Sequence, residues 1–153
     1  MLDKKIKKTT KIKKSIHYHD NDCPSCGNAM KEKVKSLIYP VNGEDIHVPS
    51  MPHLACPKCK EIILRLDEAK NLREKAIELY RKKYNLLSSE EIRSIRDRLD
   101  ISQTDLAELL RLGVNSISRW EIGKNVQTAA MDILLRIIRD VPQAMDYLKK
   151  IAA

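Results

Sequence analysis

Two Cys-x-x-Cys pairs constrain the fold of this chain of 153 residues more than any other feature. Cys23 and Cys26 form the first pair, and Cys56 and Cys59 form the second. Each Cys-x-x-Cys turn can place two thiolates on one side of a metal ion, and two such turns complete a tetrahedral shell with Zn–S distances of about 2.3 Å. The doubled spacing therefore predicts one Zn²⁺ per chain, bound by these four cysteines.

The predicted zinc site has a structural role, because four thiolates leave no open coordination position. The metal would stabilise a module too small to fold on a hydrophobic core alone. Iron or a pair of disulfides is the alternative for the same cysteines. A histidine could replace one ligand, but both cysteine pairs are complete. We therefore expect the histidines at the surface or in turns: His17, His19, His47 and His53.

An enzymatic use of the cysteines is the competing hypothesis, as a dithiol oxidoreductase or a metal hydrolase. A thioredoxin-like dithiol needs only one pair, within a βαβ pattern that this sequence lacks. A closed four-sulfur shell predicts structure in place of catalysis. We therefore expect that the protein is not an enzyme.

The segment between the cysteine pairs has the pattern of a β-hairpin. Three prolines and short β-compatible runs, at residues 34–39 and 45–48, argue against a helix there. Asn42-Gly43 is a strong hairpin-turn signal, because glycine tolerates a positive φ. A small antiparallel hairpin would bring the two cysteine pairs together.

After the second cysteine pair the apolar period becomes helical. A first amphipathic helix would connect the two halves of the chain and pack one stripe on its neighbours. The residues expected on that stripe are Leu66, Ala69, Leu72, Ala76, Leu79, Tyr80 and Tyr84. The chain has no Phe and only one Trp, a composition that also favours helices over a β-sandwich.

Residues 88–153 are predicted to form five helices and no strand. Ser88 with Glu91, and Ser102 with Asp105, have the spacing of N-terminal capping boxes. We expect Gly113 to turn the chain in a left-handed conformation and Gly123 to end a short helix that Asn115 caps. Further positions are expected to face the core: Leu106, Ala107, Leu110, Val114, Ile117, Trp120, Ala130, Ile133, Leu134, Ile137, Ile138, Leu148 and Ile151, with Pro142 opening the last helix.

A capped helix, a short turn and a second short helix form the pattern of a helix-turn-helix, whose second helix enters the DNA major groove. Arg119 can bond guanine and Asn115 can bond adenine bidentately, so both are candidates for base reading. Alternatively, Asn115 only caps the helix, and Arg119 only pairs with Glu121 or Asp105. The candidates for contacts to the DNA backbone are Ser116, Ser118 and Lys124.

The net positive charge of the chain is consistent with a DNA partner, but it does not explain how DNA would be recognised. The chain has a formal charge of +8, and residues 1–14 contain seven lysines, which we interpret as part of a mobile basic arm. Residues 88–153 contain 10 basic and 10 acidic side chains, so particular side chains must recognise DNA there. No run approaches the ~20 apolar residues of a membrane span, and a secretory signal is absent. We expect a cytoplasmic protein that binds no membrane.

The sequence Cys-Pro-Ser-Cys-Gly, then Ala-Cys-Pro-Lys-Cys, a helical connection and Gly-Val-Asn-Ser-Ile-Ser-Arg-Trp-Glu-Ile-Gly resembles the MqsA family of antitoxins, also called the YgiT type, from residue 23 to about 151. The resemblance implies an N-terminal zinc domain that neutralises an mRNA-cleaving toxin. It also implies a C-terminal domain that dimerises and represses its operon at a palindrome. The family's base-reading Asn and Arg fall on Asn115 and Arg119, and its zinc ligands fall on the four cysteines.

The resulting prediction is an α+β protein with a small zinc-stabilised β-hairpin domain, a helical linker and an all-α helix-turn-helix domain. The predicted boundaries are 1–22 for the basic arm, 23–64 for the zinc domain, 65–87 for the linker and 88–153 for the DNA-binding and dimerisation domain. Double-stranded DNA, a small ribonuclease-type toxin and a second copy of the chain are the expected partners. The alternative is a stand-alone zinc-containing transcriptional regulator with no toxin. The lysine-rich arm is extra to the family pattern, and residues 23–64 are close to neutral, which leaves toxin binding open.

Overall fold

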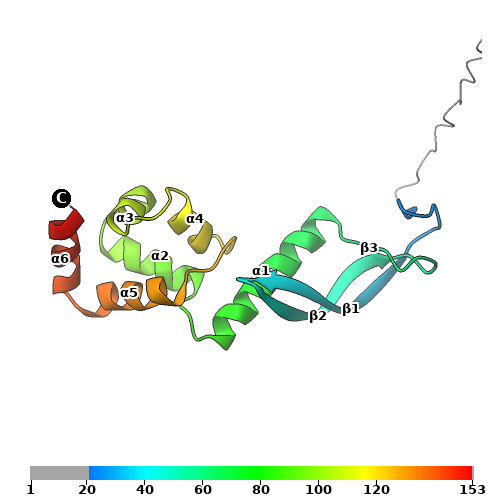
Figure 1. The fold of residues 1–153 in the computed structure, drawn as a ribbon, viewed down its shortest axis with the longest axis horizontal. Helices are drawn as coiled ribbons and strands as arrows, with labels where there is room; N and C mark the ends of the chain where they lie inside the picture. The colour runs from blue at the N-terminus through cyan, green and yellow to red at the C-terminus, as the bar shows by residue number, and fades with distance from the viewer. Residues whose placement is uncertain (1–20, 153) are drawn as a thin grey trace, which may run out of the picture.

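The structure is a computed structural model that describes residues 21–152 (Figure 1). It contains a three-stranded antiparallel sheet followed by six helices, so the α+β prediction is confirmed. Most of the predicted basic arm, with His17 and His19, lies outside the described residues. Within residues 21–152, no helix is both long enough and apolar enough to span a membrane.

The sheet consists of β1 (Lys31–Val41), β2 (Glu44–Ala55) and β3 (Ile62–Ile63), in the order β1-β2-β3. Asn42 and Gly43 form the predicted turn with φ of 50° and 82°, the two positive values that suit a tight hairpin. Both strands are longer than the sequence indicated. Ser36 stands opposite a bulge at Pro49 and Ser50, where the register shifts and the missing N–H of a proline is tolerated. The two-residue strand β3 was not predicted.

Helix α1 (Leu66–Lys83) lies across one face of the hairpin (Figure 1). It buries Leu72, Ala76 and Ile77 against β2 residues such as Val48 and Met51. The predicted stripe was therefore partly wrong. The contact face is centred on Ala76 and includes Ile77, while three expected members are exposed: Leu66, Leu79 and Tyr84. Of these, Tyr84 still reaches the hairpin, because its hydroxyl donates to Glu44 of β2.

The C-terminal part contains the five predicted helices. They are α2 (Ser89–Arg98), α3 (Gln103–Leu109), α4 (Ser116–Glu121), α5 (Ala129–Asp140) and α6 (Gln143–Ala152). Both predicted capping boxes are present, since Glu91 N–H and Asp105 N–H donate to Ser88 and Ser102 Oγ at 3.1 and 3.0 Å. The helices enclose one apolar cluster that includes Leu106, Ile117, Trp120 and Leu135.

Several predictions about single residues in this part were wrong. Arg111 takes the left-handed conformation with φ of 53°, so Gly113 does not need it, whereas Gly123 does adopt a φ of 66° as expected. Val114 is 62% exposed because it lies in the turn ahead of α4. Helix α5 packs through Leu135 and Ile138 and leaves exposed the other side of its apolar surface: Ala130, Ile133 and Ile137. Ile151 in α6 is also exposed.

Candidate functional site

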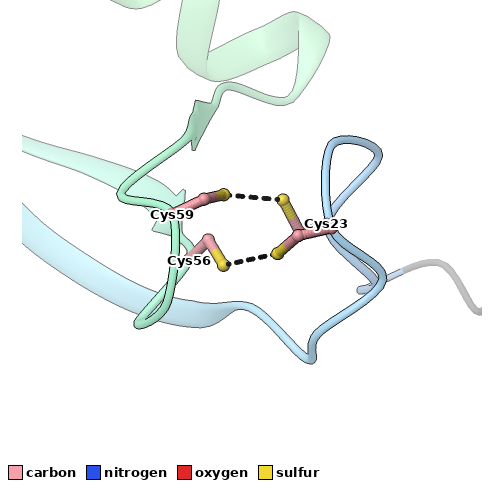
Figure 2. A group of neighbouring side chains, drawn as sticks. Cys23, Cys56 and Cys59 are labelled. Carbon is pink, nitrogen blue, oxygen red and sulfur yellow. Dashed lines mark hydrogen bonds between the residues drawn. The ribbon is translucent and has the colours of Figure 1, made fainter.

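The four cysteines converge at the base of the hairpin. Their Sγ atoms all lie within 4.8 Å of one another. Cys23 Sγ is 3.4 Å from Cys59 Sγ, and Cys26 Sγ is 3.5 Å from Cys56 Sγ (Figure 2). A tetrahedral ZnS₄ centre with bonds of about 2.3 Å has S···S separations of about 3.8 Å. The cluster therefore has the size of a four-sulfur metal site and can hold one metal ion.

The two Cys-x-x-Cys turns have the same backbone conformation. Each turn ends in a residue with positive φ, Gly27 at 71° in the first and Lys60 at 67° in the second. The matching hydrogen bonds are Gly27 N–H to Cys23 O (2.8 Å), Lys60 N–H to Cys56 O (3.1 Å), Cys23 N–H to Asn28 O (2.9 Å) and Cys56 N–H to Glu61 O (2.9 Å). Glycine adopts a positive φ readily, whereas lysine seldom does. The sequence therefore indicates the positive φ in the first turn but gives no sign of it in the second.

Hydrogen-bond donors lower the pKa of two of the thiols, Cys26 and Cys56. The backbone N–H and the side chain of Asn28, the latter 3.2 Å from Cys26 Sγ, lower the pKa of the Cys26 thiol to about 6. Backbone N–H groups of Cys59 and Lys58 lower the pKa of Cys56. These donors favour thiolates, the form that binds metal.

The thiol of Cys59 is affected by the neighbouring sulfurs in the opposite direction. The N–H of Glu61 acts to lower the pKa of Cys59, but the neighbouring thiol of Cys23 and partial burial raise it to about 12. Four adjacent thiolates repel one another, and a divalent cation at their centre removes that repulsion. The donor set therefore fits a thiophilic metal ion.

The described histidines take no part in this cluster. His47 is exposed on β2, as predicted. His53 was predicted at the surface but is only 3% exposed, and its Nδ1 lies 3.0 Å from Met51 O. Side chains alternate between the two faces of a strand, and His53 shares the buried face of β2 with Met51, on the side of α1.

The second candidate site is the exposed side of α4. Ile117 and Trp120 bury the inner side of this helix, and Arg119 points away from the core. Asn115 occupies the N-cap position, but its side chain makes no capping hydrogen bond. Asn115 and Arg119 are thus exposed four residues apart, at one face of the helix.

The two acids considered as partners for Arg119 are occupied by other groups. Asp105 accepts the N–H of Ser102 at 3.1 Å. Glu121 is buried and accepts from Arg96 Nε and Gln103 Nε2, both at 2.7 Å. Among residues 21–152, Arg119 has no side-chain hydrogen bond or ion pair.

Three further candidates surround these two residues. Ser116 and Ser118 are half-buried on α4, and Lys124 is exposed in the loop that follows. Sequence reasoning missed Val114, which is exposed directly beside Asn115, and Arg96, whose bond to Glu121 holds the end of α4. Arg96 gives no local signal, because its partner lies far along the chain.

A third surface feature is a group of exposed apolar side chains on the last two helices. Its members are Ile133 and Ile137 of α5, Val141 between the helices, and Tyr147 and Ile151 of α6, all between 43% and 65% exposed. Such a group on one part of a small domain is typical of an interface.

The fold and these sites define a class: a protein with an N-terminal four-cysteine hairpin and a C-terminal helix-turn-helix. The family model for the antitoxin component of bacterial toxin-antitoxin systems, MqsA, matches residues 21–149. The chain therefore belongs to the MqsA antitoxin family. It is also similar to antitoxin MqsA of Escherichia coli (strain K12), with 25% identity over 130 residues that cover 83% of this chain and 98% of that protein.

Proposed function

We propose that this antitoxin neutralises an mRNA-cleaving toxin and represses its own operon by binding a palindromic operator. Membership of the MqsA family supports the toxin-antitoxin role. The observation that carries the DNA-binding half is the exposed, unpaired Arg119 four residues after the exposed Asn115 on α4. We further assign the protein to the cytoplasm, where it acts by binding and carries out no chemistry.

In this proposal α4 enters the major groove, with Arg119 bonding guanine O6 and N7 and Asn115 bonding adenine N6 and N7. Ser116, Ser118 and Lys124 contact phosphates and fix the position of the helix. Bound side by side, two copies would place their α4 helices about 34 Å apart, one turn of the duplex. Occlusion of the promoter then represses transcription.

The exposed apolar group on α5 and α6 supports a homodimer through the C-terminal domain. The two halves of a palindrome are related by two-fold symmetry, so a protein that binds both is expected to form a two-fold dimer. In such a dimer the same surface of each copy contacts the other, and the exposed apolar group is the surface that we propose. The functional division that we propose is 23–64 for the zinc domain, 65–87 for the linker and 88–153 for DNA binding and dimerisation, preceded by the arm at 1–22.

For the metal we propose one structural Zn²⁺ bound by Cys23, Cys26, Cys56 and Cys59. An all-sulfur tetrahedral set favours zinc over magnesium or calcium, and the absence of a fifth ligand among the described residues supports a closed shell. Bound Zn²⁺ would offset two of the four thiolate charges, and Cys23, Cys26, Cys56 and Cys59 would hold the two turns together through it. The hairpin is then held rigid.

The hairpin also offers a surface for the toxin. Val34 and Ile38 of β1 are 65% and 52% exposed, on the face of the sheet opposite α1. β1 is an edge strand, so its outer backbone groups can pair with another chain. We propose that the toxin binds here.

The experiment that tests the function uses the product of the adjacent gene and the DNA upstream of the operon. The proposal expects the purified chain to inhibit RNA cleavage by that product and to bind a palindrome in that DNA. Operator binding with no effect on any neighbouring ribonuclease would favour the alternative, a stand-alone transcriptional regulator. Binding of neither partner would contradict both.

A further inference from the structure

Arg81, near the C-terminal end of α1, is buried between the zinc-bearing half of the chain and the helix-turn-helix. The residue is only 7% exposed. Its Nη2 donates to Trp120 O at 3.0 Å and to Asn125 O at 3.3 Å, and its Nη1 donates to Ser89 Oγ at 2.5 Å. Nη2 also donates to Gln127 Oε1 at 3.4 Å, so one guanidinium from the hairpin side binds four acceptors of the DNA-reading half.

These acceptors are neutral, which is unusual for a buried cation. No carboxylate contacts Arg81 among the residues described. Burial lowers the pKa of its guanidinium, while the charges of Glu90 and Asp132 act to raise it from a longer distance. A buried charge without an ionic partner is costly unless oriented dipoles solvate it. The carbonyl groups at the C-terminal end of α4 supply such dipoles.

The contacted atoms are the ones that define the end of α4. Trp120 O accepts hydrogen bonds from Arg81, from Ser89 Oγ at 2.8 Å and from the N–H of Gly123 at 3.3 Å. Arg119 O accepts the N–H of Lys124 at 2.8 Å. The position of Arg81 is therefore linked to the end of α4, where Arg119 lies in the helix and Lys124 in the turn that follows.

A second contact joins the same two parts. Val126, in the loop after α4, is 4% exposed and packs in the apolar cluster formed by α1 and the hairpin. In Figure 1 this loop extends from α4 toward α1 and the tip of the hairpin. The core of the zinc-bearing half is thus completed by a residue of the DNA-reading half.

The connection is narrow. A cleft of about 550 Å³ lies beside Arg81, lined by residues of α1, the start of α2 and Gly123. Because this space separates α1 from α2, few side chains bridge the two halves. Besides the connecting residues Leu86 and Leu87, which pack in the hairpin cluster and in the helical cluster respectively, the described link between the halves consists of Arg81 with its acceptors and Val126.

We propose that Arg81 is a positioning residue that fixes the zinc-bearing half relative to the DNA-reading helix. While its guanidinium is bound, the two halves keep one relative orientation. A partner that displaces α1 therefore also displaces the end of α4. The effect of this displacement on DNA binding rests on the proposed function, whereas the fixed orientation of the two halves does not.

The orientation can be measured without DNA or toxin. Residual dipolar couplings of the zinc-loaded, ¹⁵N-labelled chain report whether one alignment tensor fits both the zinc-bearing half, residues 23–83, and the DNA-reading half, residues 88–150. We expect one tensor for the wild type and for Lys82→Met, the exposed neighbour on α1. Arg81→Met should require two tensors, with each half still fitting its own structure. Two tensors in the wild type, or one in Arg81→Met, would overturn the proposal.

Two further measurements complete the test. If Arg81→Met does not fold, Arg81→Lys decides in the same way, because it keeps the charge but cannot reach all four acceptors. Operator affinity should fall roughly 2- to 30-fold in Arg81→Met, with unchanged zinc content. If the wild type binds no operator, the proposed function fails, while the dipolar couplings still decide the role of Arg81.

Discussion

Glu121 forms a buried ion pair with Arg96, with Glu121 Oε1 2.7 Å from Arg96 Nε, and so ties the last residue of α4 to α2. The side chain of Glu121 is fully buried. Burial would raise the pKa of Glu121, but hydrogen bonds from Arg96 and Gln103 lower it below its usual value. The position of α4 therefore depends on an ionised carboxylate at its last residue.

Replacement of this carboxylate should destabilise the helix-turn-helix. In Glu121→Ala, Arg96 loses its buried partner, and the free energy of unfolding should fall by about 3–5 kcal/mol. The fluorescence of Trp120, the only Trp in the chain and a core residue beside Glu121, reports urea unfolding of this domain. Glu108→Ala, at an exposed position on α3, is the control and should change little. Equal stability of the two variants would contradict the role of the pair.

The same carboxylate predicts a pH dependence. A carboxyl group whose pKa is lower in the folded state stabilises the fold fully at pH values above its pKa in the unfolded chain, which is about 4.3 for Glu. This contribution is lost as the pH falls through the lowered folded pKa, so acid should unfold the wild-type domain. Glu121→Gln binds no proton at this position, so its stability should fall less steeply below about pH 4. Urea midpoints measured between pH 3 and 7 test this, and parallel curves for the two proteins would argue against it.

The sequence predicts features that depend on neighbours along the chain. The capping boxes at Ser88 and Ser102 and the turn at Asn42-Gly43 were predicted because each is encoded within four residues. The cysteine cluster was also predicted, because metal ligands leave a fixed spacing. Contacts between distant elements leave no such spacing. The burial of Arg81 therefore has no local signal in the sequence, because its acceptors lie about 40 residues away.

Two variants should separate base reading from phosphate contact. Arg119→Ala should weaken binding to the operator by about 1–3 kcal/mol while leaving non-specific binding nearly unchanged, because the bidentate bond to guanine is lost. Lys124→Ala should weaken binding to all sequences and reduce the salt slope by about one unit. Fluorescence anisotropy with operator and scrambled duplexes at several salt concentrations measures both. A uniform loss for Arg119→Ala would assign it to a phosphate.

Loss of the metal should unfold only the N-terminal module. Cys56→Ser removes one of four ligands, and the small cluster around Cys23, Met30 and Leu54 cannot replace the lost stabilisation. Helices α2 to α6 enclose a separate apolar core, so Trp120 fluorescence and DNA binding should persist, weakened no more than in Arg81→Met. Metal analysis and two-dimensional NMR follow the two halves separately. If both halves unfold together, the metal supports the whole chain.

Dimerisation should depend on the exposed apolar group of the last two helices. Ile137, 43% exposed on α5, belongs to this group and shares a helix with Ile133, so Ile137→Asp would bury a charge in the proposed interface. Sedimentation equilibrium should show a monomer for this variant. Operator affinity should fall, because a copy bound at one half-site no longer helps a second copy to bind the other half-site. Ile38→Asp, at a similarly exposed position on the hairpin, is the matched control and should remain a dimer. A monomeric Ile38→Asp with a dimeric Ile137→Asp would move the dimer interface to the hairpin.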